Sequence, residues 1–492
     1  MRLGKLIYLY DDNRISIDGS TDIAFTEDRA ARFAAYDWQV LRVADGNDVE
    51  EIDAAIRQAK TDPRPSLIVC RTTIGFGLPT RQGTSKAHGE PPGDAELNAA
   101  KEKLGWPVEP RFYIPEEVQA HFRQAVEKGR GWEAGWRSEM DAYRAAHPEK
   151  ASELERRLRG ELPADWQSAI PVFPADEKGM ATRIASAKVI NALAAKIPEL
   201  IGGSADLAPS TKTWIDGTPA FEPETPGGRN FHFGVREHAM GAVVNGMAVH
   251  GGVVPFGATF LAFADYMREP LRLSALSHYP SIWVFTHDSI GVGEDGPTHQ
   301  PVEHLATLRA IPGMTVIRPA DANETAVAWK VAVERRGAPT LLALTRQNVP
   351  TLDRSLFAPA DGLARGAYVL ADLGDGDPEL ILMASGSEVS LIIEAGLRLA
   401  AEAVAVRLVS FPSWELFAAQ DQAYRESVFP TMTKARLAVE AGVSMGWEHW
   451  VGERGVILGI DRFGASAPSE VVYREFGLSV GNIVRQALQL VK

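Results

Sequence analysis

The sequence has a single cysteine, Cys70, in 492 residues. One cysteine excludes an intramolecular disulfide and fits a reducing compartment. No run of about 18 apolar residues occurs, so no segment is predicted to span a membrane. The N-terminal residues MRLGKLIYLYDDN contain only a short apolar stretch that acidic residues follow at once, which is not the pattern of a secretory signal. These absences favour a cytoplasmic protein.

Basic residues are scarce relative to acidic ones. The chain has 51 Lys and Arg against 64 Asp and Glu, a net charge of -13 and a pI of about 5.4. Sequence-independent binding to nucleic acids needs an excess of positive charge, so a nucleic acid is not an expected partner. A local basic pocket for a small phosphate ester remains compatible with this balance.

Buried apolar strands alternate with helices along most of the chain. Predicted strands cover residues 6–10, 66–70, 282–286, 315–317, 341–345, 380–383 and 404–409. Predicted helices cover residues 49–59, 188–200, 234–251, 324–334 and 387–401, and glycines at 202–203 are expected to break the second of them. At roughly 150 residues per domain, this order predicts an α/β fold with three domains and mainly parallel sheets.

The expected boundaries follow from changes in composition. Residues 1–114 and 166–361 each form an α/β domain, and residues 362–492 form a third. Residues 115–165 are helical, highly charged and carry Trp132 and Trp136. We expect this segment to be a linker that wraps over a neighbouring domain.

The segment HDSIGVGEDGPTHQP at 287–301 has the composition of a ligand-binding loop. It combines His287, Asp288, Asp295 and His299 with glycines that allow a ligand to approach the backbone. It follows a buried strand, and ligands of parallel α/β sheets bind at that end of the strands. A surface turn with solvated charges is the alternative.

Two further segments have an ordinary structural reading when taken alone. Glu237 falls in the first turn of the helix predicted from GVREHAMGAVVNGMAVHG, where a carboxylate complements the helix dipole. Phe260, Phe263 and Tyr266 are spaced three apart in TFLAFADYM, as in an aromatic core stripe on a helix. A further argument is needed before either is assigned a role in catalysis.

That argument is a resemblance to transketolases. It covers essentially the whole chain, in order, through YDDN at 10–13, IGFG at 74–77, HGEPPGD at 88–94, GGSADLAPS at 202–210, GVREHAM at 234–240, THDSIGVGEDGPTHQPVEHLA at 286–306, TRQN at 345–348, ASGSEV at 384–389 and FGASAP at 463–468. The GEDGPTHQP block is the most specific, because related thiamine enzymes do not carry it together with GSADLAPS.

The resemblance implies an enzyme that reversibly transfers a two-carbon ketol unit from a ketose phosphate, of the xylulose 5-phosphate type, to an aldose phosphate. The cofactors implied are thiamine diphosphate, through its C2 carbanion, and Mg²⁺ or another divalent cation such as Ca²⁺. Family members build the site between two subunits, so a homodimer is expected. Sugar phosphates are the expected partners, with no nucleic acid and no membrane.

The residues that match the family's functional positions fall into four groups. The catalytic group is Glu237, His88, His299 and His287. The cofactor-binding group is Asn13, Asp206, Glu237, Phe260, Phe263 and Tyr266. The substrate-binding group is His88, Arg183, Ser210, His287, Asp295, His299 and Arg346. The metal ligands are Asn13 and the carbonyl of Ile15.

The family's reaction gives these residues their roles. A carboxylate at pyrimidine N1′ favours the cofactor tautomer that removes the C2 proton, and Glu237 matches it. The aromatic residues form an apolar pocket in which that single hydrogen bond is strengthened. Histidines handle hydroxyl protons, Asp295 matches the partner of the substrate C2 hydroxyl, and arginines suit the phosphate because their forked donors pair with two oxygens.

The sequence departs from the family at its start. The family's metal-binding Gly-Asp-Gly has no counterpart before Asn13, and the Gly-Asp-Gly at 374–376 lies in the third domain, where it predicts a turn. We therefore expect that the N-terminal part of the diphosphate-binding domain is missing and that the chain as written binds the cofactor weakly. Three readings stay open: a transketolase with a lost or misassigned start, a non-catalytic subunit that keeps the fold, and one half of a split enzyme.

Overall fold

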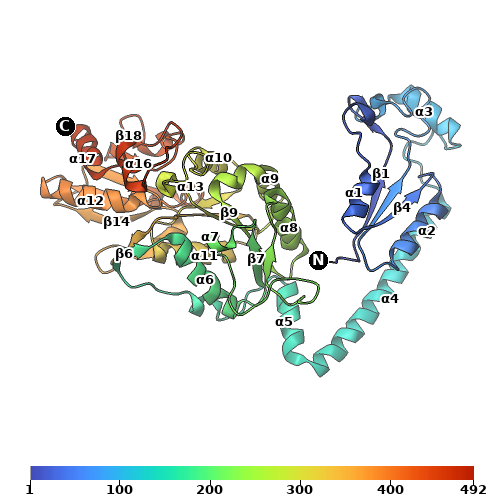
Figure 1. Cartoon of the computed structure of the whole chain (residues 1–492), viewed down its shortest axis with the longest axis horizontal. Helices are drawn as coiled ribbons and strands as arrows, with labels where there is room; N and C mark the ends of the chain where they lie inside the picture. Colours follow the sequence, from blue (N-terminus) through green and yellow to red (C-terminus); the bar gives the residue numbers. More distant parts are fainter. Residues whose placement is uncertain (1) are drawn as a thin grey trace. The chain divides into compact units, whose positions relative to one another are not determined.

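The computed structural model describes residues 2–492 and divides the chain into two compact units. Unit 1 ends at Tyr143, and unit 2 runs from Arg144 to Lys492. Unit 1 includes the elements from β1 to α3 in Figure 1, and unit 2 includes those from α5 to α17.

Unit 1 is built on a three-stranded parallel sheet of order β1-β5-β4. Its strands are β1 (Ile7–Asp11), β4 (Gln39–Val43) and β5 (Ser66–Cys70), and its first helices are α1 (Arg29–Ala35) and α2 (Val49–Ala59). Every residue of the central strand β5 is buried. Leu67 and Val69 pack in one core cluster, and Ile68 and Cys70 pack in another, as the two faces of a strand require. The predicted strand at 66–70 and helix at 49–59 are confirmed.

The first strand differs from the sequence prediction. Residues 6–10 were expected to form a buried strand, but Tyr8 is 53% exposed and Leu9 50% exposed in β1. β1 is an edge strand that pairs with β5 alone, so its apolar composition does not report burial within unit 1.

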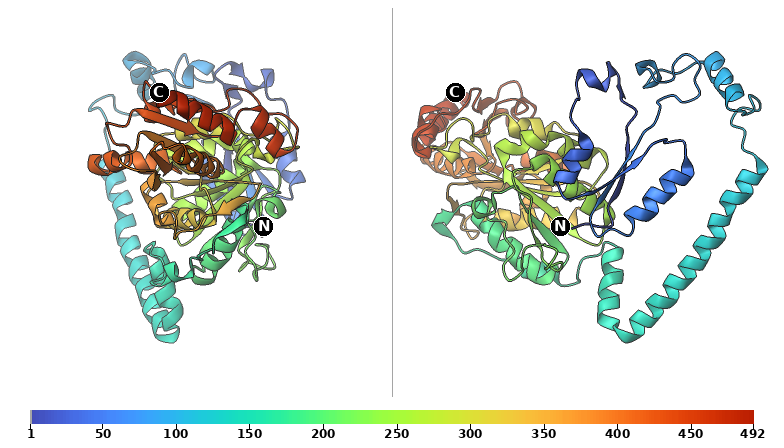
Figure 2. Two further views of the ribbon diagram at one scale, coloured as in Figure 1. Left: turned by 90° about the vertical axis from the view of Figure 1, so that its left-hand side faces the viewer. Right: turned by 45° about the vertical axis from the view of Figure 1, so that its right-hand side comes forward.

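The segment predicted as a charged linker is helical. After α3 (Asp94–Lys103) it forms α4 (Glu116–Ala146), a long continuous helix in Figure 2, and then α5 (Pro148–Leu158). Trp132 and Trp136 of α4 are exposed, and Met140 is the buried residue of that helix. In α5, Ala151 is buried and Arg156 pairs with Glu199 of the following domain. The wrapping expected for the whole segment stays a prediction.

Unit 2 begins with a six-stranded parallel sheet of order β11-β12-β10-β9-β7-β8. Its strands are β7 (Leu200–Ser204), β8 (Asn230–His232), β9 (Val254–Phe260), β10 (Ile282–Thr286), β11 (Thr315–Ile317) and β12 (Thr340–Leu344). The helix before the first strand is α6 (Thr182–Lys196), and those between the strands are α7 (Ala208–Thr211), α8 (Glu237–His250), α9 (Arg268–Leu276), α10 (His304–Arg309) and α11 (Ala322–Glu334). Separate core clusters around Leu193 and Trp329 and around Met240 and Leu271 pack with the strands of this sheet.

Two local predictions in this sheet are wrong. The helix expected to reach residue 200 ends at Lys196, and residues 200–204 form the strand β7. Its glycines are needed because neighbouring strands approach closely: a Cβ on Gly203 would lie 1.9 Å from the Phe231 carbonyl oxygen. The expected helix at 259–267 instead starts as the end of β9 and continues as a 3-10 helix, η4 (Leu261–Met267).

The C-terminal part of unit 2 has a five-stranded sheet of order β14-β16-β15-β17-β18, in which only β14 is antiparallel among the described strands. The strands are β14 (Tyr368–Leu373), β15 (Leu380–Ala384), β16 (Val406–Ser410), β17 (Ala435–Val439) and β18 (Val456–Leu458). The helices are α12 (Glu388–Ala401), α13 (Trp414–Ala418), α14 (Gln422–Val428), α15 (Glu448–Val451), α16 (Ser469–Glu475) and α17 (Val480–Leu490). Gly374 and Gly376 follow β14 with positive φ, which confirms the predicted turn.

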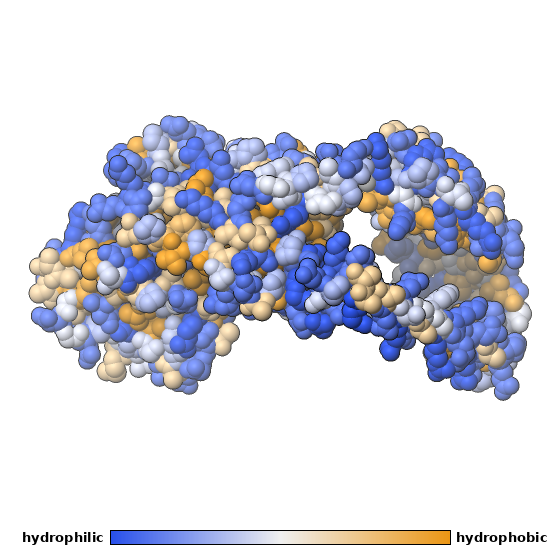
Figure 3. Space-filling model, turned by 90° about the horizontal axis from the view of Figure 1, so that it is seen from below, coloured by the Kyte–Doolittle hydropathy of each residue, from blue (hydrophilic) through white to orange (hydrophobic). Residues whose placement is uncertain are grey.

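The surface keeps a number of large apolar side chains. Figure 3 shows hydrophobic patches among a mainly hydrophilic surface on the face it presents. Of the helices described in residues 2–492, none combines the length and the apolar character that crossing a membrane requires.

Candidate functional site

The six-stranded sheet places several predicted site residues at one edge. The strands β12, β10, β9 and β7 are consecutive neighbours and all parallel, so their carboxyl ends share that edge. Arg346 follows β12, His287 follows β10, Phe260 ends β9 and Asp206 follows β7. This is the edge at which parallel α/β sheets bind ligands.

Five predicted residues form one aromatic cluster. The rings of Phe260 and His287 stack with centroids 3.7 Å apart, and Phe260 stacks on Phe263 at 5.5 Å. His299 contacts the edge of Phe263 at 5.4 Å, and Tyr266 lies 6.0 Å from Phe263. Phe260 is buried and Tyr266 is 67% exposed, so the cluster runs from the core to the surface.

Glu237 is a buried carboxylate without a partner. It is the first residue of α8 and only 8% exposed, and it forms no hydrogen bond or ion pair with any described residue. Burying an unpaired carboxylate is costly, although the N-terminus of the helix offsets part of the cost. The position therefore suits a ligand that donates a hydrogen bond.

A pair of threonines brings two arginines together. The Thr182 backbone N–H donates to Thr345 Oγ1 at 2.9 Å, and the Thr345 N–H donates to Thr182 Oγ1 at 2.8 Å. These bonds tie the start of α6 to the end of β12, so that Arg183 lies near Arg346. Burial and the nearby Arg346 lower the pKa of Arg183.

The arginine pair has unused hydrogen-bonding capacity. Arg183 donates from Nη1 to the Ser210 carbonyl at 2.5 Å, but its buried Nε has no partner among the described residues. Two neighbouring guanidinium groups without a carboxylate partner suit a phosphate, whose oxygens accept forked donors.

His287 is a strained and buried residue beside this pair. Its φ of +61° lies in the left-handed region, and its Nδ1 is 2.8 Å from Thr286 Oγ1. Burial, and then the charges of Arg183 and Arg346, lower the pKa of His287 to about 3. The ring is therefore neutral near pH 7, where it can donate or accept a hydrogen bond without adding charge.

Two predicted acidic residues lie on exposed turns. Asp206 has a φ of +62°, and Asp295 lies in the turn closed by the Gly296 N–H and the Gly293 carbonyl at 3.1 Å. Neither carboxylate forms a hydrogen bond or ion pair with a described residue. Both are accessible to a ligand.

Asn13, Ile15 and His88 belong to unit 1. Asn13 Oδ1 accepts a hydrogen bond from the Ile15 N–H at 2.8 Å, so the two predicted metal ligands are linked locally. His88 follows the short helix η2 (Ser85–Ala87) and is exposed. All the other predicted site residues belong to unit 2.

One further group of potential metal ligands occurs among the described residues: Asp265, Glu303 and His304. Asp265 Oδ2 is 3.3 Å from His304 Nε2, whereas Glu303 Oε2 is 3.8 Å from Nδ1. The carboxylates thus face opposite ring nitrogens, whose lone pairs diverge.

The sequence did not predict the network below the His287 loop. Arg318, which follows β11, is completely buried and donates from Nε to Asp288 Oδ2 at 2.8 Å. Its other nitrogens bind Glu388 at the start of α12. An arginine directly after a buried strand was the available signal.

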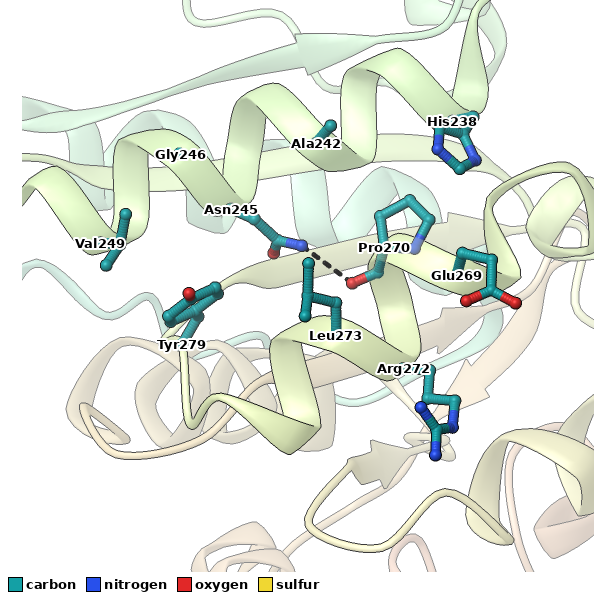
Figure 4. Close-up of a pocket in the computed structure, with 10 residues that line it drawn as sticks. All are labelled: His238, Ala242, Asn245, Gly246, Val249, Glu269, Pro270, Arg272, Leu273 and Tyr279. Atoms are coloured by element: carbon teal, nitrogen blue, oxygen red, sulfur yellow. Dashed lines mark hydrogen bonds between the residues drawn. The ribbon is translucent and has the colours of Figure 1, made fainter. Parts of the chain in front are cut away.

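A surface groove of about 380 Å³ lies between α8 and α9, and Figure 4 shows the residues that line it. The Asn245 side chain donates to the Pro270 carbonyl at 2.8 Å across it. It contains none of the predicted site residues, although His238 at one end directly follows Glu237. Val249 and Leu273 line it and are exposed, so the groove is largely apolar.

Three family profiles match the chain. The profile described as transketolase, thiamine diphosphate binding domain, matches residues 1–163. The transketolase pyrimidine binding domain matches residues 178–351, and the transketolase-like C-terminal domain matches residues 366–479.

Individual relatives give the same result. The transketolase of Geobacillus stearothermophilus is 52% identical over 492 residues, which are all of this chain and 74% of that protein. A transketolase from a Nostoc species is 53% identical over 99% of this chain and 73% of its own length.

Solved structures also match closely. A transketolase from Leishmania mexicana superposes with a TM-score of 0.94 at 42% identity. One from Pichia stipitis in complex with sedoheptulose 7-phosphate has a TM-score of 0.95 at 41% identity, and each match covers 100% of this chain and 72% of the other. This chain spans about three quarters of the length of these relatives, and the expected absence of an N-terminal segment stays a prediction.

Proposed function

The chain belongs to the transketolase family, and from that membership we propose which of its residues bind the cofactor and the substrates. It is a transferase that moves two-carbon ketol units between sugar phosphates with the help of thiamine diphosphate. The domains proposed are 1–114, 166–361 and 362–492, with 115–165 as the connecting segment.

The pyrimidine ring of the cofactor is proposed to bind between Glu237 and the aromatic cluster. The unpaired, buried Glu237 carboxylate fits the ring's N1′ donor, and Phe260 and Phe263 provide an apolar surface that excludes water. Tyr266 extends that surface toward solvent. Once bound, thiamine diphosphate supplies the nucleophilic carbon and the electron sink of the reaction.

The diphosphate is proposed to bind through a divalent cation, Mg²⁺ or Ca²⁺, held by the Asn13 side chain and the Ile15 carbonyl. Both groups offer the oxygen ligands that hard cations require, and the second lone pair of Asn13 Oδ1 stays available beside its bond to Ile15. Asp206, exposed at the end of β7, is proposed to contact the cofactor as well.

The substrate phosphate is proposed to bind to Arg183 and Arg346, with Ser210 and the neutral His287 beside them. The observation that carries this assignment is the cationic pair with an unsatisfied Arg183 Nε. His299 and His88 are proposed to exchange protons with substrate hydroxyls. Asp295 is proposed to accept a hydrogen bond from the C2 hydroxyl, which would favour donors of the xylulose 5-phosphate type.

A homodimer with the site at the subunit interface is proposed as well. Support comes from the exposed apolar side chains of Val249, Leu273 and Leu276 on α8 and α9, the helices that flank the groove of Figure 4. Apolar patches of this kind mark association surfaces. The single cysteine and the acidic composition favour a cytoplasmic location.

The assignment is tested by steady-state ketol transfer from xylulose 5-phosphate to ribose 5-phosphate. Losing a charge-assisted contact should raise the KM of Arg183→Ala for xylulose 5-phosphate by about 10- to 100-fold. The KM for unphosphorylated xylulose should not change. Arg454→Ala, which removes an exposed arginine of the C-terminal part, is the control. Equal losses with both donors would exclude a phosphate contact, and no turnover by the unmutated chain would favour a non-catalytic role.

A further inference from the structure

The loop 287–300 is attached to the C-terminal part of unit 2 at both of its ends. At one end Asp288 binds Arg318, which in turn binds Glu388 of α12. At the other end the Ser466 hydroxyl donates to the Glu294 carbonyl at 2.6 Å, and Gln300 Nε2 donates to the Ala465 carbonyl at 3.0 Å. The loop therefore has attachments outside the sheet that carries it.

The attachment at Asp288 is completely buried. Arg318, Asp288 and Glu388 are each no more than 1% exposed. Arg318 also donates to the Ser385 carbonyl at 3.1 Å, and Tyr473 donates from its hydroxyl to Glu388 Oε1 at 2.8 Å. Buried charges with several partners each hold one geometry, because any displacement leaves a charge unpaired.

The attachment at residues 293–300 is tightly packed. Gln300 bridges the Gly293 carbonyl at 2.7 Å and the Ala465 carbonyl. A Cβ on Gly464 would lie only 1.7 Å from Gln300 Oε1, so the backbone of 464–466 fits directly against the loop. Ser466 and Gln300 thereby fix the turn that carries Asp295 and the residues leading to His299.

The residues held in this way are those proposed to meet the substrate. His287 immediately precedes Asp288 and has a φ of +61°, a conformation that persists only where the surroundings determine it. Asp295 and His299 lie between Glu294 and Gln300. By contrast, Glu237 and η4 lie on other elements and have no part in these contacts.

We propose that the C-terminal domain positions the substrate loop: Glu388 and Tyr473 act on His287 through Arg318 and Asp288, and Ser466 acts on Asp295 and His299 through the Glu294 carbonyl. This rests on the proposed roles of the three loop residues. Glu388, Tyr473, Arg318 and Ser466 are positioning residues, because they act on the substrate only through the loop, and Asp288 is the loop residue to which Arg318 binds.

The first test compares conservative variants by hydrogen exchange and mass spectrometry of the full chain without cofactor. Tyr473→Phe and Ser466→Ala each remove one hydroxyl, and the double variant should exchange the amides of residues 288–300 at least several-fold faster. The amides of α8 should exchange as before. Tyr424→Phe and Ser427→Ala are the controls, because their hydroxyls bond to backbone carbonyls within the C-terminal domain and away from the loop.

The second test separates substrate positioning from cofactor activation. In the holoenzyme the double variant should lose about 10-fold in kcat/KM for ketol transfer, since small misplacements of reacting groups are costly. Exchange of the cofactor's C2 proton, which depends on Glu237, should keep the unmutated rate. Loop exchange and kinetics equal to those of the two controls would overturn the proposal.

These outcomes are distinguishable from failure of the proposed function. If the unmutated chain shows no ketol transfer, the proposed function fails, while faster exchange of 288–300 in the double variant would still show that the C-terminal domain holds the loop. If ketol transfer by the unmutated chain is normal and the double variant matches the two controls, only the positioning role is excluded.

Discussion

Glu237 has a local environment that leaves its side-chain oxygens available to a ligand. It is buried at the start of α8 and has no protein partner among the described residues. Glu237→Gln keeps the shape but removes the charge that favours protonation at pyrimidine N1′. We expect C2 proton exchange of the bound cofactor to slow by about 10²- to 10⁴-fold. The measurement is deuterium exchange by NMR, with the exposed Glu453→Gln of the C-terminal part as control, and an unchanged rate would remove Glu237 from this role.

His287 should make stability depend on pH. Its pKa is lowered to about 3, against 6.5 for an ordinary histidine. Between those values the unfolded chain binds more protons than the folded one, so stability falls as the pH drops from 6.5 toward 3 and is unaffected above 6.5. Between those pH values, the loss of folding free energy caused by His287 approaches ~1.4 kcal/mol per pH unit.

The variant His287→Asn should lose less stability than the unmutated chain on acidification. Thermal unfolding midpoints measured between pH 7 and pH 4 provide the comparison. The exposed His250→Asn serves as the control, and its midpoints should follow those of the unmutated chain. Parallel curves for His287→Asn and the unmutated chain would show that His287 is readily protonated in the folded state.

At the scale of secondary structure, the start of α11 connects the six-stranded and the five-stranded sheets of unit 2. Asp321 caps the helix by accepting from the Glu324 N–H at 2.8 Å, and it also pairs with Arg354 at 2.8 Å. Glu324 in turn accepts from the Tyr368 hydroxyl at 2.7 Å. The cap is therefore part of a buried network that reaches β14.

This network predicts that replacing an N-cap aspartate by alanine destabilises the chain more at position 321 than at position 421. Asp321→Ala should destabilise the chain by about 3–5 kcal/mol, because it leaves Arg354 without its buried partner. Asp421→Ala removes an exposed cap of α14 and should cost about 1 kcal/mol. Thermal or denaturant unfolding of both variants provides the measurement, and equal costs would show that the Arg354 pair contributes nothing.

The sequence predicted those elements best whose pattern is local. Strands β5 and β10 were predicted at their observed bounds, because each is a short, fully buried apolar run. β7 was missed because Gly202 and Gly203 resemble a helix break. Glycine is required at these positions because Phe256 and Phe231 on neighbouring strands approach closely. A close contact between strands depends on residues that are distant in the sequence, so it cannot be read from the local pattern.

The same distinction applies to the site. The resemblance to transketolases supplied Glu237, Phe260, Phe263, His287 and His299, and the structure places them at one edge of a sheet. The Thr182–Thr345 pair and the Arg318 network join segments separated by dozens of residues or more. A local pattern marks only Arg318, which directly follows a buried strand, and the other residues are unremarkable until the fold supplies their partners.

At the scale of the whole molecule, the proposed site draws on both units. Asn13, Ile15 and His88 belong to unit 1, while Glu237 and the arginine pair belong to unit 2. Each unit has its own core clusters, so each can hold its part of the site in shape. The proposed metal ligands and the proposed pyrimidine-binding residues can therefore come from one chain or from two.

Complementation between inactive variants decides between these arrangements. If Asn13 of one subunit meets Glu237 of the other, a dimer of one Asn13→Ala chain and one Glu237→Gln chain contains one site in which both residues are intact. With random pairing, half of the dimers are mixed and each has one working site of two, so about a quarter of the unmutated activity should return. Variants coexpressed with different tags and assayed for ketol transfer provide the measurement, and each variant assayed alone gives the background. If the mixed dimers, isolated through both tags, stay at that background, the residues meet within a single chain and the shared site is excluded.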